Sequence, residues 1–247
     1  MINQIKAEQI KLKSTRFFWI HLLIPLAGIL CFSAYFKVTH YALLTFSSTF
    51  FSGMALCYPM VIAVVCEVVF SQEMAVSNGY WILSAPSRSK ALTVKLVYLL
   101  GFSLLAGLFT TVGLGVSLSL IANSSALSLA YLVTMAILLW SCAVFSYFLH
   151  TWLALKAGRN VNLGVATFEL LVSALLMTGL GDGIWPFFPN AWGARVVLQW
   201  TNAFYHISST SSFPDYGLFG IMFVMNMLMI CFVYSWFQHW DGRNKLD

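Results

Sequence analysis

Residues 17–36 read FFWIHLLIPLAGILCFSAYF, and they follow the basic segment MINQIKAEQIKLKSTR at residues 1–16. A run of about 20 apolar residues is long enough for a helix to cross the ~30 Å hydrocarbon core of a membrane. A signal peptide also has a basic start, but its apolar core is shorter and ends at a small-residue cleavage site. We therefore predict that residues 17–36 form a retained membrane-spanning helix.

The rest of the chain has the same apolar character. Of its 247 residues, 60% are hydrophobic and only 9% are charged, whereas soluble domains carry about 25% charged residues. Lipid offers no partner for free backbone N–H and C=O groups, so long apolar runs form helices, and the sequence lacks the short alternating segments of a β-barrel. We predict a single all-α membrane domain over residues 1–247 with six transmembrane helices, at about 17–36, 47–70, 96–121, 128–153, 163–180 and 216–238.

The basic residues predict the orientation of these spans. With the N-terminus inside, the cytoplasmic pieces are 1–16, 71–95, 154–162 and 239–247, and they hold 11 of the 13 lysines and arginines. This bias satisfies the positive-inside rule and places both termini in the cytoplasm. It also explains the net charge of +5 without a nucleic-acid partner. Segment 1–16 is predicted to be a cytoplasmic amphipathic segment along the headgroups, or a basic flank that orients the first span.

Enzyme chemistry is not indicated by any motif. The sequence lacks the Gly-x-x-x-x-Gly-Lys-Ser/Thr pattern, in which backbone N–H groups and the lysine bind phosphate together. The glycines at 179–183 are interpreted as a turn. The five histidines are scattered, and the five cysteines lie in apolar runs without metal-ligand spacing. We expect no catalytic residue, metal or cofactor site in this chain.

A first candidate site is the predicted cytoplasmic loop 71–95. It combines an acid, a glycine break, an apolar-aromatic patch and a proline with basic residues, namely Glu73, Gly79, Trp81, Leu83, Pro86, Arg88 and Lys95. The proline restricts the residue before it, so we predict a short helix that ends near Ala85. Such a helix offers Trp81 and Leu83 to a partner's groove, or it is an interfacial helix anchored by Tyr80 and Trp81.

A second candidate site is the predicted external connection 181–215. Its tryptophans and prolines indicate a re-entrant or surface-lying hairpin at the membrane interface, with the candidate residues Asp182, Trp185, Pro189, Trp192 and Arg195. Pairing of Asp182 with Arg195 lowers the cost of placing both near lipid. Two interpretations stay open: an aromatic belt with a capped turn, and an external gate or recognition surface.

The predicted fifth span contains one acid, Glu169. An ionisable side chain in lipid is costly and usually faces a bundle interior or a wet cavity. The sequence leaves two roles for Glu169 open, a structural hydrogen bond and a place in a transport pathway.

Both candidate sites resemble a known family. The loop residues resemble the cytoplasmic loop of type 2 ABC exporter permeases, with Tyr80 where that family usually has threonine; the match is carried by Glu73, Gly79, Leu83, Pro86, Arg88 and Lys95. Gly-Asp-Gly-Ile-Trp at 181–185 and Pro-x-Ala-Trp-Gly-x-Arg at 189–195 resemble the permease subunits of lantibiotic immunity ABC transporters. The likeness extends to 158–160, 162–164 and the basic N-terminus.

The resemblance implies a multi-pass permease in the bacterial plasma membrane that expels a lantibiotic or similar peptide. It implies that loop 71–95 docks on a separate ABC ATPase dimer, which binds ATP and Mg, and that a second permease, identical or homologous, completes the transporter. Full translocation and release from the outer leaflet both stay open. The sequence also allows an ion-driven secondary transporter, with Glu169 as its coupling acid, or a membrane assembly or sensor protein without transport.

Overall fold

The fold is all-helical wherever the structure describes the chain. The structure is a computed structural model that describes residues 2–13, 15–39, 41–77, 79–85, 87–124, 126–207 and 216–242, without the side chains of 2–4, 75–77, 80, 81 and 216. In these ranges the residues form α-helices, short 3-10 helices and turns, with no strand. The predicted all-α class is confirmed.

Within the described ranges, five helices are long and apolar enough to cross a membrane: α2 (Phe17–Val38), α3 (Leu43–Ser77), α5 (Arg88–Ala122), α6 (Leu129–Lys156) and α9 (Tyr216–Gln238). Serine side chains cap the starts of α5 and α6, where Ser87 and Ser128 accept hydrogen bonds from backbone N–H groups of the first turn. Large apolar side chains also stay exposed on these helices, such as Leu30 at 60% and Phe223 at 64%. The chain is therefore a multi-pass helical membrane protein.

Shorter elements connect these five helices. They are α1 (Ile2–Lys13), α4 (Tyr80–Leu83), α7 (Arg159–Leu176), the 3-10 helices η1 (Gly179–Gly181) and η2 (Trp185–Phe187), and α8 (Pro189–Phe204). Helix α7 corresponds to the run predicted at 163–180, but it begins and ends four residues earlier. It has 18 residues and is not among the five helices that qualify by length and hydropathy.

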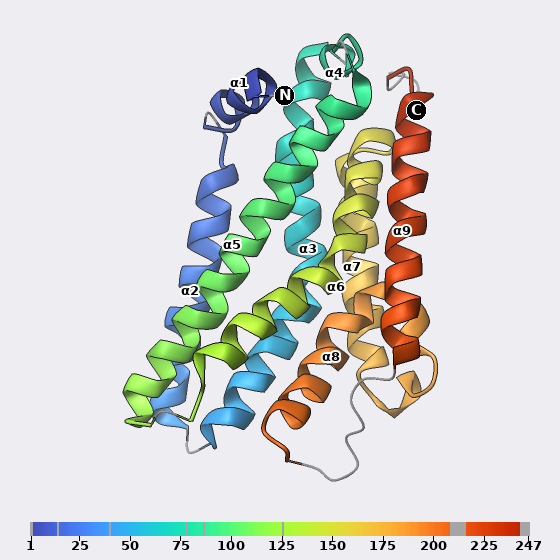
Figure 1. Cartoon of the computed structure of the whole chain (residues 1–247). Coiled ribbons are helices and arrows are strands. Elements are labelled where there is room, and N and C mark those ends of the chain that lie inside the picture. Colours follow the sequence, from blue (N-terminus) through green and yellow to red (C-terminus); the bar gives the residue numbers. More distant parts are fainter. Residues whose placement is uncertain are drawn as a thin grey trace.

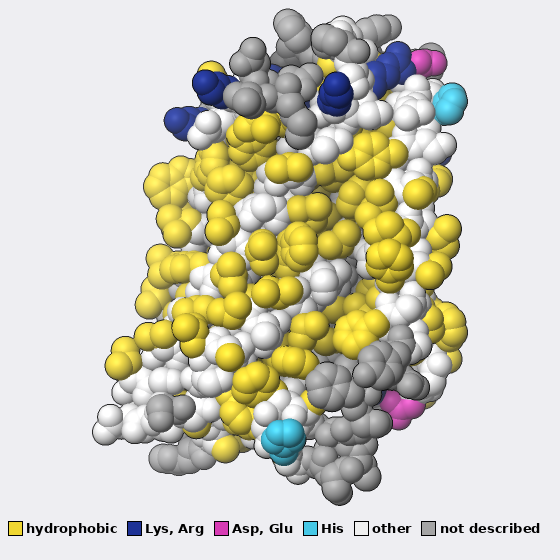
Figure 2. Space-filling model, viewed as in Figure 1, with side chains coloured by type: hydrophobic (Ala, Val, Ile, Leu, Met, Phe, Trp, Pro, Cys, Tyr) yellow, Lys and Arg dark blue, Asp and Glu magenta, His cyan; other side chains and the backbone are white. Residues whose placement is uncertain are grey.

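Both ends of the described chain lie at the same end of the bundle (Figure 1). We call it the basic end; it contains α1, α4, the start of α5 and the end of α9. Figure 2 shows Lys and Arg side chains gathered at this end above a broad apolar band. The opposite end, called the hairpin end, contains η1, η2 and the end of α8.

The buried apolar side chains of the described residues form three core clusters. One lies toward the basic end and includes Phe17, Phe70 and Phe237 of α2, α3 and α9. A second lies toward the hairpin end and includes Phe51 and Tyr131 of α3 and α6. The third includes Trp185 and Trp192 of the predicted hairpin.

Both predicted connections contain more helix than the sequence indicated. Helix α3 continues to Ser77 and α5 begins at Arg88, so the predicted loop 71–95 is reduced to α4 and two short turns. Helix α4 ends at Leu83, two residues before the expected end at Ala85. The predicted hairpin 181–215 contains α8, 16 residues long, and residues 208–215 lie outside the described part.

Helix α8 packs closely against the bundle because Gly193 faces α3. A Cβ atom at Gly193 would lie 3.0 Å from the Cβ of Ala55, which is tighter than ordinary van der Waals contact. A small residue at this position therefore lets the two helices approach, as small residues do between membrane helices. The connection returns into the bundle instead of lying only on its surface.

Candidate functional site

Two of the predicted loop residues, Glu73 and Lys95, meet in a buried group of charges at the basic end. The Lys95 Nζ lies 3.0 Å from Glu73 Oε1 and 2.5 Å from Oε1 of Glu8 in α1. The Lys11 Nζ lies 2.8 Å from the same Glu73 oxygen and 4.0 Å from Glu8 Oε2. We call Glu8, Lys11, Glu73 and Lys95 the four-charge cluster.

Three members of this cluster are almost fully buried. The side chains of Lys95, Glu73 and Glu8 are 4%, 5% and 8% exposed, whereas Lys11 is 45% exposed. A buried charge is tolerated when an opposite charge and hydrogen bonds compensate for its lost hydration. The cluster therefore joins α1 to the end of α3 and to the second turn of α5.

Helix α1 docks on the bundle through this cluster and one apolar side chain. Leu12 is buried to 1% exposure in the core at the basic end. The Tyr98 hydroxyl of α5 also donates a hydrogen bond to the Ile5 carbonyl, at 3.0 Å. The association of α1 with headgroups stays a prediction, but its inward face is set by these contacts.

Two other predicted loop residues, Gly79 and Arg88, contact the end of α9. Gly79 has a φ of +89°, and a Cβ there would lie 2.8 Å from the Trp240 ring. The Arg88 Nη1 donates to the carbonyls of Gln238 and Trp240, each at 3.2 Å, and lies 3.8 Å from an Asp241 carboxylate oxygen. The positive φ and the close ring both favour glycine at position 79.

The apolar loop residues have a different placement from the one expected for a docking surface. Leu83 is half-buried against the core at the basic end, and its neighbour Ile82 is 3% exposed. The side chain of Trp81 and all of Pro86 lie outside the described part of the chain. Ser84 and Lys90 are exposed at the tip of this region.

The segment from Glu73 to Lys95, which we call the coupling segment, comprises the end of α3, the short helix α4 and the start of α5. The four-charge cluster attaches it to α1, and Gly79 and Arg88 contact residues at and just after the end of α9. Helix α4 lies between these two groups of contacts, and its Ile82 is buried in the core at the basic end.

At the hairpin end the predicted pair of Asp182 and Arg195 is confirmed. The Arg195 Nη1 lies 2.9 Å from Asp182 Oδ1. The same guanidinium also donates to the carbonyls of Leu176 and Thr178, at 2.7–2.9 Å. Arg195 therefore satisfies carbonyls at the end of α7, a role typical of basic side chains at helix C-termini.

Trp185 and Trp192 belong to the core, which differs from the interfacial aromatic belt that the sequence left open. Trp192 has 0% exposure and its indole N–H donates to the Pro186 carbonyl at 2.8 Å, while Trp185 is 8% exposed. Pro189 is the first residue of α8, where its missing N–H costs no hydrogen bond. The exposed apolar side chains at and next to the start of this connection include Leu180, Ile184, Phe187 and Phe188.

Glu169 makes a buried hydrogen bond, one of the two roles that the sequence left open for it, within a network whose other members the sequence did not predict. Its Oε2 lies 2.9 Å from Nε2 of His150 in α6. The His150 Nδ1 lies 2.7 Å from Asn162 Oδ1, and Asn162 Nδ2 donates to the Ala63 carbonyl of α3 at 3.1 Å. Because the Asn162 side-chain oxygen can only accept, the Nδ1–H of His150 donates the hydrogen bond between them.

This network joins α3, α6 and α7. His150 and Asn162 are both fully buried. The sequence did not indicate a role for His150, because its partners Asn162 and Glu169 lie on a different helix, α7, and not one or two turns away on α6.

Among the described residues, no three His, Cys, Asp or Glu side chains are placed to hold a metal ion. Comparisons of the chain with protein-family models, with curated proteins and with solved structures found no match. The functional argument therefore starts from the coupling segment and the hairpin of this chain.

Proposed function

We propose that this protein is the membrane-spanning permease subunit of an ABC exporter that expels a lantibiotic or similar antimicrobial peptide from the membrane. A separate ABC ATPase dimer binds ATP and Mg and docks at the basic end, and a second permease, identical or homologous, completes the complex. The observation that carries the proposal is the coupling segment, because it connects one exposed tip to α1, α3, α5 and α9.

The proposed topology has six spans with both termini in the cytoplasm. Helix α7 has 18 residues, which at 1.5 Å per residue gives about 27 Å, close to the ~30 Å hydrocarbon thickness. The described chain begins and ends at the same end of the bundle, which supports an even number of crossings. The basic end then faces the cytoplasm by the positive-inside rule.

The proposed substrate would meet the hairpin end. Leu180, Ile184, Phe187 and Phe188 are each at least 44% exposed there. The side chain of Asp182 is 69% exposed beside them, although it is paired with Arg195. An apolar surface with an acid at its edge has the chemistry to receive a cationic amphipathic peptide from the outer leaflet.

The partner is tested by purifying the full chain from the bacterium that makes it and identifying ABC ATPase subunits by mass spectrometry. Lys90→Glu reverses the charge of an exposed residue at the tip, and Arg159→Glu reverses an exposed charge at the turn between α6 and α7. We expect Lys90→Glu to reduce the recovered ATPase and Arg159→Glu to leave it unchanged. An equal recovery with both variants would argue against docking at the coupling segment.

The substrate is tested by deleting the gene and measuring growth over a panel of lantibiotics. We expect increased sensitivity to at least one of them, restored by the wild-type gene but not by a double variant with Phe187→Ser and Phe188→Ser. Unchanged sensitivity to every peptide of the panel would contradict the immunity function.

An ion-driven secondary transporter is the second candidate, and the His150–Glu169 pair is the observation that favours it. Ionisable residues inside membrane proteins often mark proton pathways. Transport that continued without any ATPase and stopped when the proton gradient was collapsed would favour this alternative. A membrane assembly or sensor protein would instead co-purify with a partner other than an ATPase.

A further inference from the structure

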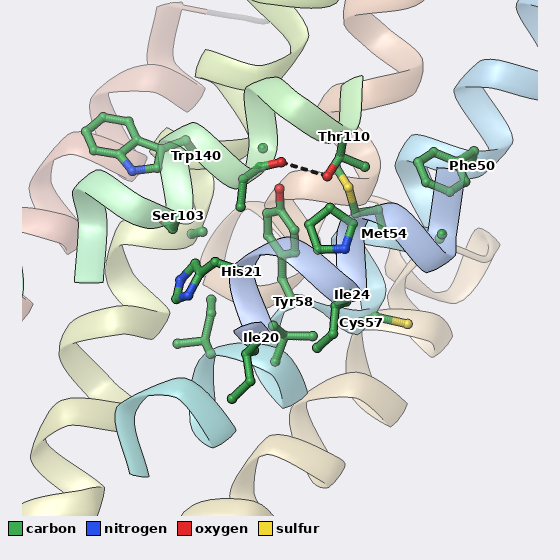
Figure 3. A pocket seen from close by; sticks show the side chains of 18 of the residues that line it. Ile20, His21, Ile24, Phe50, Met54, Cys57, Tyr58, Ser103, Thr110 and Trp140 are labelled. Carbon is green, nitrogen blue, oxygen red and sulfur yellow. Dashed lines mark hydrogen bonds between the residues drawn. The ribbon is translucent and has the colours of Figure 1, made fainter. Parts of the chain in front are cut away.

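A cavity of about 350 Å³ lies between α2, α3, α5 and α6, separate from the coupling segment and the hairpin. Figure 3 shows Ile24, Met54 and Tyr58 around it, with Trp140 and Phe50 at opposite sides of the view. Its volume is in the range of small-molecule sites, which are concave and mostly apolar.

The cavity exists because glycines face it from three helices. Gly28, Gly53 and Gly107 all line it. A Cβ at Gly53 would meet no atom within 4 Å, and a Cβ at Gly107 would lie 3.8 Å from the Tyr58 hydroxyl. The neighbouring side chains therefore do not fill the volume that these glycines leave.

Three polar side chains of the lining, Ser103, Thr110 and Trp140, make hydrogen bonds to nearby backbone. The Trp140 indole N–H donates to the Leu100 carbonyl at 2.9 Å. The Ser103 hydroxyl donates to the same carbonyl, and the Thr110 hydroxyl donates to the Ala106 carbonyl, as the dashed line in Figure 3 shows. Water needs two to four polar partners to occupy a cavity, so this lining favours hydrocarbon.

The cavity is long and runs parallel to the helices. Its lining extends from Ile20 to Phe32 on α2 and from Phe50 to Ile62 on α3. Twelve residues of helix rise by about 18 Å, slightly more than half of the ~30 Å hydrocarbon thickness. Ile24 and Cys57 of the lining are exposed, so the cavity opens to the surface between α2 and α3.

Two basic residues come shortly before Ile20, the lining residue of α2 nearest the basic end. Ile20 is one helical turn after Arg16, since the Ile20 N–H donates to the Arg16 carbonyl at 3.0 Å. Arg16 and Lys13 are both exposed. Basic side chains at the edge of a membrane helix attract anionic lipid headgroups.

We propose that this cavity holds one acyl chain of an anionic glycerophospholipid, with the phosphate beside Arg16 and Lys13. The lipid comes from the leaflet at the basic end, and its chain lies between α2 and the rest of the bundle. The length of the cavity, its apolar lining and the basic residues near its end together favour an acyl chain of an anionic lipid. The proposal goes beyond the proposed function and holds for a transporter of any class.

The full chain is reconstituted in phosphatidylcholine vesicles that contain phosphatidylglycerol with a diazirine midway along one acyl chain. After irradiation, adducts are mapped by peptide mass spectrometry. We expect them to concentrate on residues 20–32 and 50–62, and not on the exposed face of α9. Adducts spread evenly over all exposed apolar faces, or absent from the cavity, would overturn the proposal.

Two variants fill the cavity and one serves as a matched control. Gly53→Leu and, should that variant fold poorly, Gly107→Leu are expected to reduce adducts in the cavity roughly tenfold, the effect of displacing about two buried CH₂ groups. Gly101→Leu changes an exposed glycine of α5 that has no atom within 4 Å of its Cβ position, so its adducts should stay unchanged. Equal yields in filled and control variants would contradict the site.

The headgroup is tested with Arg16→Gln. We expect the yield with photoactivatable phosphatidylglycerol to fall to that of the matching phosphatidylcholine probe, while the labelled positions stay the same. If the wild-type chain already labels equally with both probes, the proposed phosphate contact is wrong.

Discussion

Replacing Lys95 by methionine removes the cation that holds the four-charge cluster together. Methionine keeps most of the length and apolar volume of the lysine stem. It leaves Glu8 and Glu73 with the half-exposed Lys11 as the remaining cation of the cluster, 2.8 Å from Glu73 and 4.0 Å from Glu8. Because Glu8 and Glu73 are 8% and 5% exposed, bulk water cannot replace the lost ammonium. We expect the variant to fold less stably, with α1 detached from α5.

The magnitude follows from the geometry. At distances of 2.5 and 3.0 Å, and with an effective dielectric constant of ~20, each pair has an attraction of about 5–7 kcal/mol before desolvation. Desolvation offsets much of this gain, but loss of one partner from a buried pair typically costs about 3–5 kcal/mol. For a chain of this size that corresponds to a fall in melting temperature of roughly 6–20 °C.

The assay is thermal unfolding of the purified protein in detergent, followed by tryptophan fluorescence, with hydrogen exchange of α1 as a second measurement. Lys90→Met is the control, because Lys90 is exposed on the same helix. A triple variant with Glu8→Gln, Glu73→Gln and Lys95→Met should regain most of the stability, since no unpaired buried carboxylate remains. A Lys95→Met protein as stable as the Lys90→Met control, with α1 protected equally, would refute this reasoning.

Three further changes test the other contacts. Gly79→Ala places a Cβ against the Trp240 ring and strains a positive φ, so we expect the free energy of unfolding to fall by about 1–2 kcal/mol. An unchanged free energy of unfolding would show that α4 moves freely. Glu169→Leu leaves His150 with an unsatisfied buried nitrogen and should lower the free energy of unfolding by about 1–3 kcal/mol more than Glu169→Gln does. Denaturant titration measures this difference, and equal stability of the two variants would contradict the network. Arg195→Gln removes both the ion pair and the contacts to the carbonyls at the end of α7, whereas Asp182→Asn removes the ion pair alone. An exposed ion pair contributes only about 0–1 kcal/mol, so Arg195→Gln should lower the melting temperature more. Equal shifts in melting temperature would mean that the carbonyl contacts add no stability.

The membrane helices were predictable because the length of an apolar run directly measures its ability to cross hydrocarbon. Residues 17–36 lie within α2 and 216–238 coincide with α9. The pairing of Asp182 with Arg195 was predictable as well, since both belong to one short connection. The inward burial of Trp185 and Trp192 was not, because an interfacial and a buried tryptophan have the same local sequence.

By itself, the sequence determined that the chain is a helical multi-pass membrane protein and that its positive charge is concentrated in a few connections. Composition and the length of the apolar runs are enough for this, because each span can satisfy its own backbone hydrogen bonds in lipid as a helix, independently of its neighbours. Only the tertiary structure decided which charges meet. Glu8 and Lys95 are 87 residues apart, and His150 and Glu169 are 19 apart on different helices. A buried charge needs a partner to compensate for its lost hydration, and the packing of the helices determines which residue is that partner.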